Sequence, residues 1–279
     1  LQMQKIFSAD NPRGRVMRIH ADLPDKSAAG KPFVLAVHGL DSNLHEYGLY
    51  DAVAETLAKE GIACLRFDFP GNGESAEPFT CYTHKNMLDD MDCVRDFAVN
   101  TLGLSPVLFG VQGYSMGGRA ACLYTARHPE ISCLSLWAPG VTPGVDVIKS
   151  FLRDEPDLIS AYKAIAANGV FSYDPFGVHD LQFSAEFFRE LKHSDPLEVL
   201  DSYRGDVFCA MGCRDTVVDP RDMALVSVYC ESARSLEMVK FSDGGHDFGT
   251  AYGRGTQNAE IINVLTSKTA AYFVRHLCI

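Results

Sequence analysis

The chain has 279 residues, 47% of them hydrophobic and 22% charged, which is typical of one large α/β domain that dissolves in water. Its formal net charge of −11 repels phosphate backbones, so nucleic acid is not an expected partner. No apolar run approaches the roughly 20 residues that cross a bilayer, and the nine cysteines have neither C-x-x-C nor zinc-site spacing. We therefore expect a cytoplasmic protein with reduced thiols, no membrane span, no metal and no cofactor.

Apolar runs of strand length alternate with amphipathic stretches of helix length along most of the chain. The expected strands are 33–37, 62–67, 107–112, 132–137, 207–211 and 236–241, and the expected helices are 47–59, 87–99, 116–127 and 261–276. Two further runs, 3–7 and 16–19, predict an antiparallel edge. Because strands that alternate with helices need crossover connections, the sequence predicts an α/β fold with a mostly parallel central sheet flanked by helices.

Residues 140–204 interrupt this alternation with turn-forming pairs and many aromatic rings. We expect a cap or lid insertion there, above a core formed by residues 1–139 and 205–279. Aromatic rings favour a flat or long apolar acyl group, although most of these rings are expected to bury the insertion on the core. The candidate substrate contacts are Tyr114, Trp137, Tyr173 and Phe176.

A G-x-S-x-G pentapeptide runs from Gly113 to Gly117, after an expected strand and before an expected helix. This context is typical of a nucleophile on a tight strand-to-helix turn, where side chains two positions to either side would collide. The helix that follows presents free N–H groups to a developing oxyanion. The motif therefore predicts Ser115 as the nucleophile and the Met116 N–H as an oxyanion donor.

An alcohol needs a base to take its proton, and in proteins with this turn the chain order is serine, acid, histidine. His246 follows the expected strand 236–241 in a glycine-containing loop, which makes it the candidate base. The other histidines after the serine, expected at helix ends, on the surface or in the insertion, are His128, His179, His193 and His276. Asp215, after the expected strand 207–211, is the candidate acid. Asp219 precedes Pro220 and a helix, where an N-cap role fits better.

The loop after the first buried strand is His38-Gly39-Leu40. A backbone N–H from this loop normally completes the oxyanion hole beside such a serine, and Leu40 is the expected donor. For His38, at the strand end, we expect a hydrogen bond that braces the loop.

In identity and order, these motifs resemble the α/β-hydrolase superfamily over essentially the whole chain. The run from Arg66 to Ser75 also resembles small microbial cinnamoyl (feruloyl) esterases, which carry Phe-Asp-Phe-x-Gly-x-Gly-x-Ser there. The chain departs from that group at Pro70 and Glu74. The resemblance implies a compact cap, a carboxylic-ester substrate, and oxyanion N–H groups at the two positions named above.

The expected function is that of a serine hydrolase that cleaves esters of small acyl groups, cinnamoyl or feruloyl types included, through an acyl-enzyme. The partner is then a small-molecule ester. An amidase or peptidase, a thioesterase and an acylglycerol lipase remain open, because the same three residues serve all of them. A non-catalytic ligand-binding protein on this fold is a further alternative, and the intact serine, acid and histidine argue against it.

Overall fold

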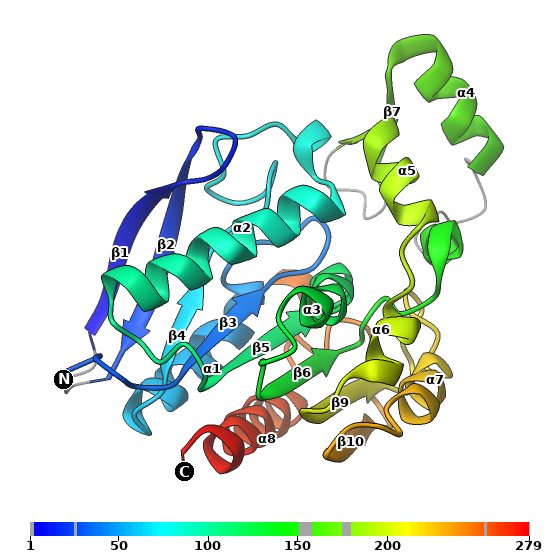
Figure 1. Ribbon diagram of the computed structural model, residues 1–279. Coiled ribbons are helices and arrows are strands. Elements are labelled where there is room, and N and C mark those ends of the chain that lie inside the picture. Colours follow the sequence, from blue (N-terminus) through cyan, green and yellow to red (C-terminus); the bar gives the residue numbers. More distant parts are fainter. Residues whose placement is uncertain (1–2, 25–26, 151–157, 175–179, 254–255, 279) are drawn as a thin grey trace.

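The computed structural model describes residues 3–24, 27–150, 158–174, 180–253 and 256–278. Within these residues, one sheet contains eight strands in the order β1-β2-β4-β3-β5-β6-β9-β10 (Figure 1). The strands are β1 (Met3–Asp10), β2 (Val16–Leu23), β3 (Phe33–Val37), β4 (Ala63–Arg66), β5 (Phe109–Tyr114), β6 (Cys133–Trp137), β9 (Asp206–Gly212) and β10 (Ser235–Phe241). From β4 to β10 all neighbours are parallel, whereas β1 pairs with β2 and β2 with β4 in antiparallel fashion. The predicted fold class and antiparallel edge are confirmed.

The central strands are apolar because both of their faces are covered. Every residue of β3, β4, β5, β6 and β9 is buried, which is the pattern expected of parallel strands between two helical layers. The edge strand β10 is mostly half-buried. Because parallel strands end at the same side of the sheet, the loops after β3, β5, β9 and β10 converge there.

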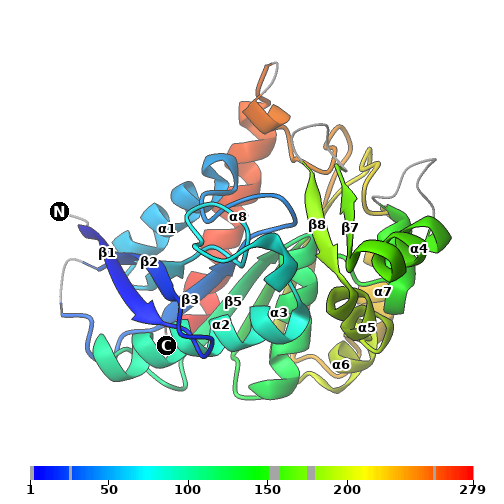
Figure 2. The same cartoon turned by 90° about the horizontal axis from the view of Figure 1, so that it is seen from above.

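Helices pack on both faces of the sheet (Figures 1 and 2). α1 (Leu49–Lys59) and α8 (Ala259–Leu277) pack together on one face, and α2 (His84–Asp96) and α3 (Met116–Arg127) pack together on the other. The bounds predicted for α3 agree with the structure. The helix expected at 87–99 begins earlier, because Thr83 accepts the Asn86 N–H as an N-cap, and it ends in a π turn, Phe97–Thr101.

The region expected as a cap contains more regular structure than its sequence suggested. It consists of η4 (Gly144–Ser150), α4 (Leu158–Asn168), β7 (Val170–Tyr173), β8 (Leu181–Ser184), α5 (Ala185–Lys192) and α6 (Pro196–Ser202). β7 and β8 form a separate antiparallel pair, and α4, β7 and α5 stand to one side of the sheet (Figure 1). α6 packs on α3 and on α7 (Asp222–Tyr229). α6 therefore belongs to the layer of helices that covers the sheet on the α3 side.

The aromatic rings of this region pack mostly against each other and the core. The Phe183 ring lies 5.0 Å from that of Phe187 and 5.2 Å from that of Phe79, measured between centroids. Phe183 and Phe187 are both fully buried. Such packing orders the β7–β8 pair and α5 against the turn that precedes α2.

A buried arginine on α3 binds both the start of this region and the segment just before α6. Arg119 has no exposed surface and donates to the carbonyl oxygens of Gly140, Thr142 and Ser194 at 2.7 to 2.9 Å. It also donates to Ser194 Oγ at 2.6 Å, and the Gly144 N–H donates to the carbonyl of the same serine at 2.9 Å. Burial lowers the pKa of Arg119 to about 10, so the side chain still carries its charge at neutral pH.

Candidate active site

The turn between β5 and α3 holds Ser115 in a strained conformation. Its backbone has φ 54° and ψ −118°, a region that a residue with a side chain rarely adopts. A Cβ atom on Gly113 would lie 2.5 Å from the Gly117 carbonyl oxygen, and one on Gly117 would overlap the His38 carbonyl. Both glycines are therefore required by close backbone contacts, and the serine side chain is directed away from the strand.

Three buried side chains from three loops meet at this turn. His246 Nε2 lies 3.1 Å from Ser115 Oγ, and His246 Nδ1 lies 2.7 Å from Asp215 Oδ2. The other carboxylate oxygen of Asp215 accepts the N–H groups of Val217 and Val218 at 2.8 and 2.9 Å. Because a carboxylate can only accept, the proton between Asp215 and His246 belongs to Nδ1, which leaves Nε2 free to accept from the serine.

The competing candidates lie elsewhere. Asp219 is bound to Arg221, whose guanidinium and backbone N–H lower the pKa of the Asp219 carboxyl to about 2. Helix α7 begins only at Asp222, so Asp219 is not its N-cap residue.

The other histidines after the serine do not approach Ser115 in the described part of the chain. His128 is the C-cap residue of α3, and its Nε2 lies 2.6 Å from Asp92 Oδ1. His193 is exposed after α5. His276 was expected on the surface, but it is largely buried and its Nδ1 lies 2.9 Å from Asp206. His179 falls outside the described residues.

The loop after β3 lies against the serine and is braced from both sides. Nδ1 of His38 donates to the Gly39 carbonyl at 2.7 Å, and Nε2 accepts the Phe69 N–H at 2.9 Å, so the expected bracing role of His38 is confirmed. A Cβ on Gly39 would lie only 3.3 Å from Ser115 Cβ. The next peptide group, that of Leu40, therefore begins beside Ser115.

No sequence motif singles out Glu46, yet this residue contacts the loop directly. The Gly39 N–H donates to Glu46 Oε1 at 2.5 Å, and the glutamate has no exposed surface. Asp68 supports the same loop by accepting the Leu44 N–H at 2.6 Å. The Asp68 contact spans 24 residues, and the Glu46 contact depends on the irregular path of the loop between residues 39 and 46, so no periodicity could have predicted them.

The expected substrate contacts occupy several different environments. Tyr114 is buried, its ring is stacked on that of His246 at 5.2 Å, and its hydroxyl donates to the His246 carbonyl at 2.6 Å. It therefore supports the histidine. The expectation for Trp137 is wrong, because its side chain is fully buried and its Nε1 donates to Thr269 on α8 at 3.0 Å. Tyr173 is half-buried on β7, and Phe176 lies outside the described residues.

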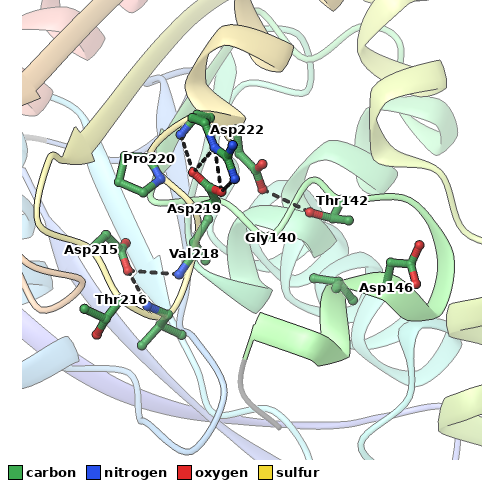
Figure 3. A pocket seen from close by; sticks show the side chains of 12 residues that line it. Gly140, Thr142, Asp146, Asp215, Thr216, Val218, Asp219, Pro220 and Asp222 are labelled. Carbon is green, nitrogen blue, oxygen red and sulfur yellow. Dashed lines mark hydrogen bonds and ion pairs between the residues drawn. The ribbon is translucent and has the colours of Figure 1, made fainter. Parts of the chain in front are cut away.

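A cavity of about 640 Å³ lies beside the Asp215 loop (Figure 3). Its walls come from the segment after β6 and from residues 215–222, and their charged groups are the carboxyl groups of Asp146, Asp215, Asp219 and Asp222 and the guanidinium of Arg221, which is paired with Asp219. Asp222 accepts the Thr142 hydroxyl at 3.0 Å, and burial raises the pKa of its carboxyl. The cavity therefore suits neutral or cationic groups better than anionic ones.

Two other kinds of site are absent from the part of the chain that the structure describes. None of its helices has the length and apolar character that crossing a membrane requires. No cluster of three or more histidine, cysteine or acidic side chains is arranged there to hold a metal ion.

Comparison with known proteins agrees with the fold. Residues 29–167, about half of the chain, match the model of a family described as serine aminopeptidase, S33. The AB hydrolase superfamily protein YisY of Bacillus subtilis (strain 168) is 30% identical over 150 residues, which are 47% of this chain and 52% of that protein. The matched part thus spans about half the length of this curated relative.

Solved structures resemble the chain over almost its entire length. Est1E from Butyrivibrio proteoclasticus, solved with ferulic acid bound, has a TM-score of 0.78 at 18% identity and covers 98% of this chain and 100% of its own. The esterase Pf2001 of Pyrococcus furiosus has a TM-score of 0.69 at 18% identity, and the match covers 99% of this chain and 93% of the esterase. At this identity the likeness concerns the fold. With its mostly parallel sheet, its strained serine turn and these likenesses, the chain has the α/β-hydrolase fold.

Proposed function

We propose that the chain is a serine hydrolase in which Ser115 is the nucleophile, His246 the general base and Asp215 the acid that orients the base. The observation that carries this proposal is the unbroken line of contacts from Ser115 Oγ through both nitrogens of His246 to the Asp215 carboxylate, at 3.1 and 2.7 Å. These separations are within hydrogen-bond reach of a nucleophile, its base and an orienting carboxylate.

The reaction proceeds in two halves. Ser115 Oγ attacks the carbonyl carbon while its proton passes to His246 Nε2, and the carbonyl becomes a tetrahedral oxyanion. His246 then protonates the leaving oxygen, the bond to it breaks, and an acyl-enzyme remains. Water, deprotonated by the same nitrogen, attacks the acyl-enzyme, and the acid product leaves as the serine recovers its proton.

The oxyanion is stabilised by the backbone N–H groups of Met116 and Leu40. Met116 is the first residue of α3, where N–H groups lack partners within the helix. Leu40 follows Gly39, whose own N–H is taken by Glu46, so the next N–H along the loop is the one available to the substrate.

The substrate is a carboxylic ester with a small acyl group, and we propose that residues 140–204 form the cap that selects it. The support is the position of α4, β7 and α5 to one side of the sheet (Figure 2), and, independently of that view, the half-buried state of Tyr173 on β7. An aromatic acyl group of the cinnamoyl type would gain stacking and apolar contact from such rings.

A second candidate is the hydrolysis of esters or amides that carry an amine. The carboxylates of Asp146 and Asp222 in the cavity beside Asp215 favour this reading, because they attract a cation. The catalytic groups are the same in both cases, and the two candidates differ only in the group that the cavity accepts.

A substrate panel separates these candidates. Methyl ferulate, short p-nitrophenyl esters, a matching thioester and an aminoacyl amide are offered to the wild type and to Ser115→Ala. Turnover of esters that Ser115→Ala abolishes supports the proposal, and faster turnover of the amine-bearing substrate supports the second candidate. If no substrate is cleaved and a fluorophosphonate fails to label Ser115 in the folded protein, the catalytic proposal is refuted.

A further inference from the structure

Glu46 carries a carboxyl group that is wholly enclosed behind the oxyanion loop. One of its oxygens, Oε1, accepts the Gly39 N–H at 2.5 Å. The other, Oε2, is buried and accepts no well-formed hydrogen bond among the described residues, although the Ser42 hydroxyl is close enough to the carboxyl to stabilise its negative charge. A carboxylate would leave the lone pairs of this oxygen poorly satisfied, whereas a neutral acid carries its proton there.

The surroundings of this carboxyl favour the neutral form. Burial raises the pKa of Glu46 to about 8, and the negative charge of Asp68 acts in the same direction. The Gly39 N–H and the Ser42 hydroxyl lower the pKa without cancelling the effect of burial. The groups that face Glu46 from the elements packed around it are Asp68 after β4 and four tyrosine hydroxyls, Tyr50, Tyr82, Tyr114 and Tyr252. None of these groups is a cation.

The backbone is strained where it directs this side chain inward. Glu46 and Tyr47 have φ values of 43° and 54°, and Gly48 follows with φ 89°. Non-glycine residues in this region persist only where the surrounding structure holds them, and such strain is common at functional sites. The distortion here directs a carboxyl group toward the loop that contacts Ser115.

The carboxyl is close to the reacting atoms. The position that a Cβ on Gly39 would take lies 3.3 Å from Ser115 Cβ and 3.5 Å from Glu46 Oε1. One peptide group thus separates the glutamate from the nucleophile. In a buried site, a full negative charge at this range opposes the negative charge that develops on the substrate oxygen.

We propose that Glu46 is a positioning residue that acts as a neutral carboxylic acid: it fixes the Gly39 amide so that the Leu40 N–H remains free for the oxyanion, and loss of its proton switches turnover off. The inference rests on the proposed serine hydrolase function. It assigns the activity of this chain an alkaline limit that arises from the oxyanion loop.

The test compares pH profiles of kcat/KM between pH 6 and 10 for the wild type, Glu46→Gln, Glu46→Ala and Glu55→Gln. Glutamine keeps the acceptor for Gly39 and remains neutral at every pH, whereas alanine removes the acceptor. Glu55, on the exposed face of α1 and paired with Lys59, is the matched control. Rates of fluorophosphonate labelling of Ser115 are measured in parallel, because they report the attack step without deacylation.

At pH 9, the kcat/KM of the wild type and of Glu55→Gln should be about a tenth of its plateau value, as the loss of one proton with a pKa of about 8 requires. Glu46→Gln should remain within about threefold of the wild type at pH 7 and lose this alkaline limb. Glu46→Ala should be at least about tenfold slower at every pH, because the buried Gly39 N–H loses its partner. An unchanged alkaline limb in Glu46→Gln overturns the inference, as does a loss of more than about a hundredfold in this variant at pH 7 while it remains folded.

Infrared difference spectra keep the inference testable if a substitution prevents folding. Selective ¹³C labelling of glutamate carboxyl groups in the wild type should show a buried protonated carboxyl band at pH 6.5 that disappears by pH 9.5. Absence of that band at neutral pH overturns the inference. Failure of the proposed function looks different, because Ser115 is then unlabelled and no substrate is cleaved at any pH, whatever the state of Glu46.

Discussion

Replacing Asp215 by asparagine should trap His246 in the wrong tautomer. Oδ1 of Asp215 accepts the N–H groups of Val217 and Val218, so the amide oxygen of asparagine must occupy that position. The amide nitrogen then faces His246 Nδ1, which has to give up its proton in order to accept. The imidazole proton moves to Nε2, where it points at Ser115 Oγ and prevents the ring from acting as a base.

The size of the effect follows from this geometry. A serine hydrolase whose histidine has the wrong tautomer loses about 10⁴-fold in kcat, which corresponds to about 5.5 kcal/mol in the activation free energy. The free energy of unfolding should change little for Asp215→Asn, because every hydrogen bond has a counterpart. Asp215→Ala leaves two backbone N–H groups without acceptors and should lose about 1–3 kcal/mol for each one that stays buried.

The assay combines kcat on the best ester of the panel with urea unfolding of the wild type, Asp215→Asn and Asp215→Ala. Asp215→Asn should lose almost all of its kcat and keep the wild-type free energy of unfolding, whereas Asp215→Ala should lower both quantities. Retention of more than about a tenth of wild-type kcat by folded Asp215→Asn would refute the tautomer argument. Equal unfolding free energies for the two variants would show that the backbone contacts of the carboxylate do not stabilise the fold.

Three further predictions concern residues around the site. Tyr114→Phe removes the hydrogen bond that the tyrosine hydroxyl donates to the His246 carbonyl. Steady-state kinetics should show a kcat lowered about threefold to tenfold and an unchanged KM. Gly117→Ala forces a methyl group against the carbonyl of His38, so its melting temperature should fall and fluorophosphonate labelling should be lost; wild-type values for both would show that the turn can relax. The hydrogen bond to Asp92 raises the pKa of His128. The stabilisation that this bond gives the folded protein is therefore complete below the ordinary pKa of histidine and is lost as the pH rises through the raised pKa. His128→Asn should therefore cost more unfolding free energy at pH 6 than at pH 9.5, and an equal cost would contradict this assignment.

Periodicity and motif spacing predicted the elements that build the sheet and the turn that carries Ser115. The helix expected at 116–127 begins where a strained serine and two glycines require a turn, and it ends before Pro129. These are local signals, and local sterics decide them. The region 140–204 was predicted less well, because its short strands and helices are stabilised by aromatic contacts with distant residues such as Phe79.

The candidate site shows the same division. Ser115, Asp215 and His246 each follow a strand, so the parallel sheet itself predicts that their loops converge. Glu46 and Tyr114 act through contacts with Gly39 and with the histidine backbone, and these depend on loop paths that no spacing encodes. Trp137 was misjudged for a related reason: a ring at a strand end can face either a ligand or the helix behind the sheet, and here Thr269 of α8 receives its N–H.

The contacts of Arg119 have a consequence for how such a protein can diversify. Because one side chain on the core binds both Gly140 and Ser194, the segment between them leaves and re-enters the body at nearly the same point. A segment with adjoining ends can be lengthened, shortened or exchanged as a module while the sheet and the loops that carry Ser115, Asp215 and His246 keep their positions. Grafting another hydrolase's insertion between these two residues, with the arginine retained, should therefore transfer specificity without rebuilding the core.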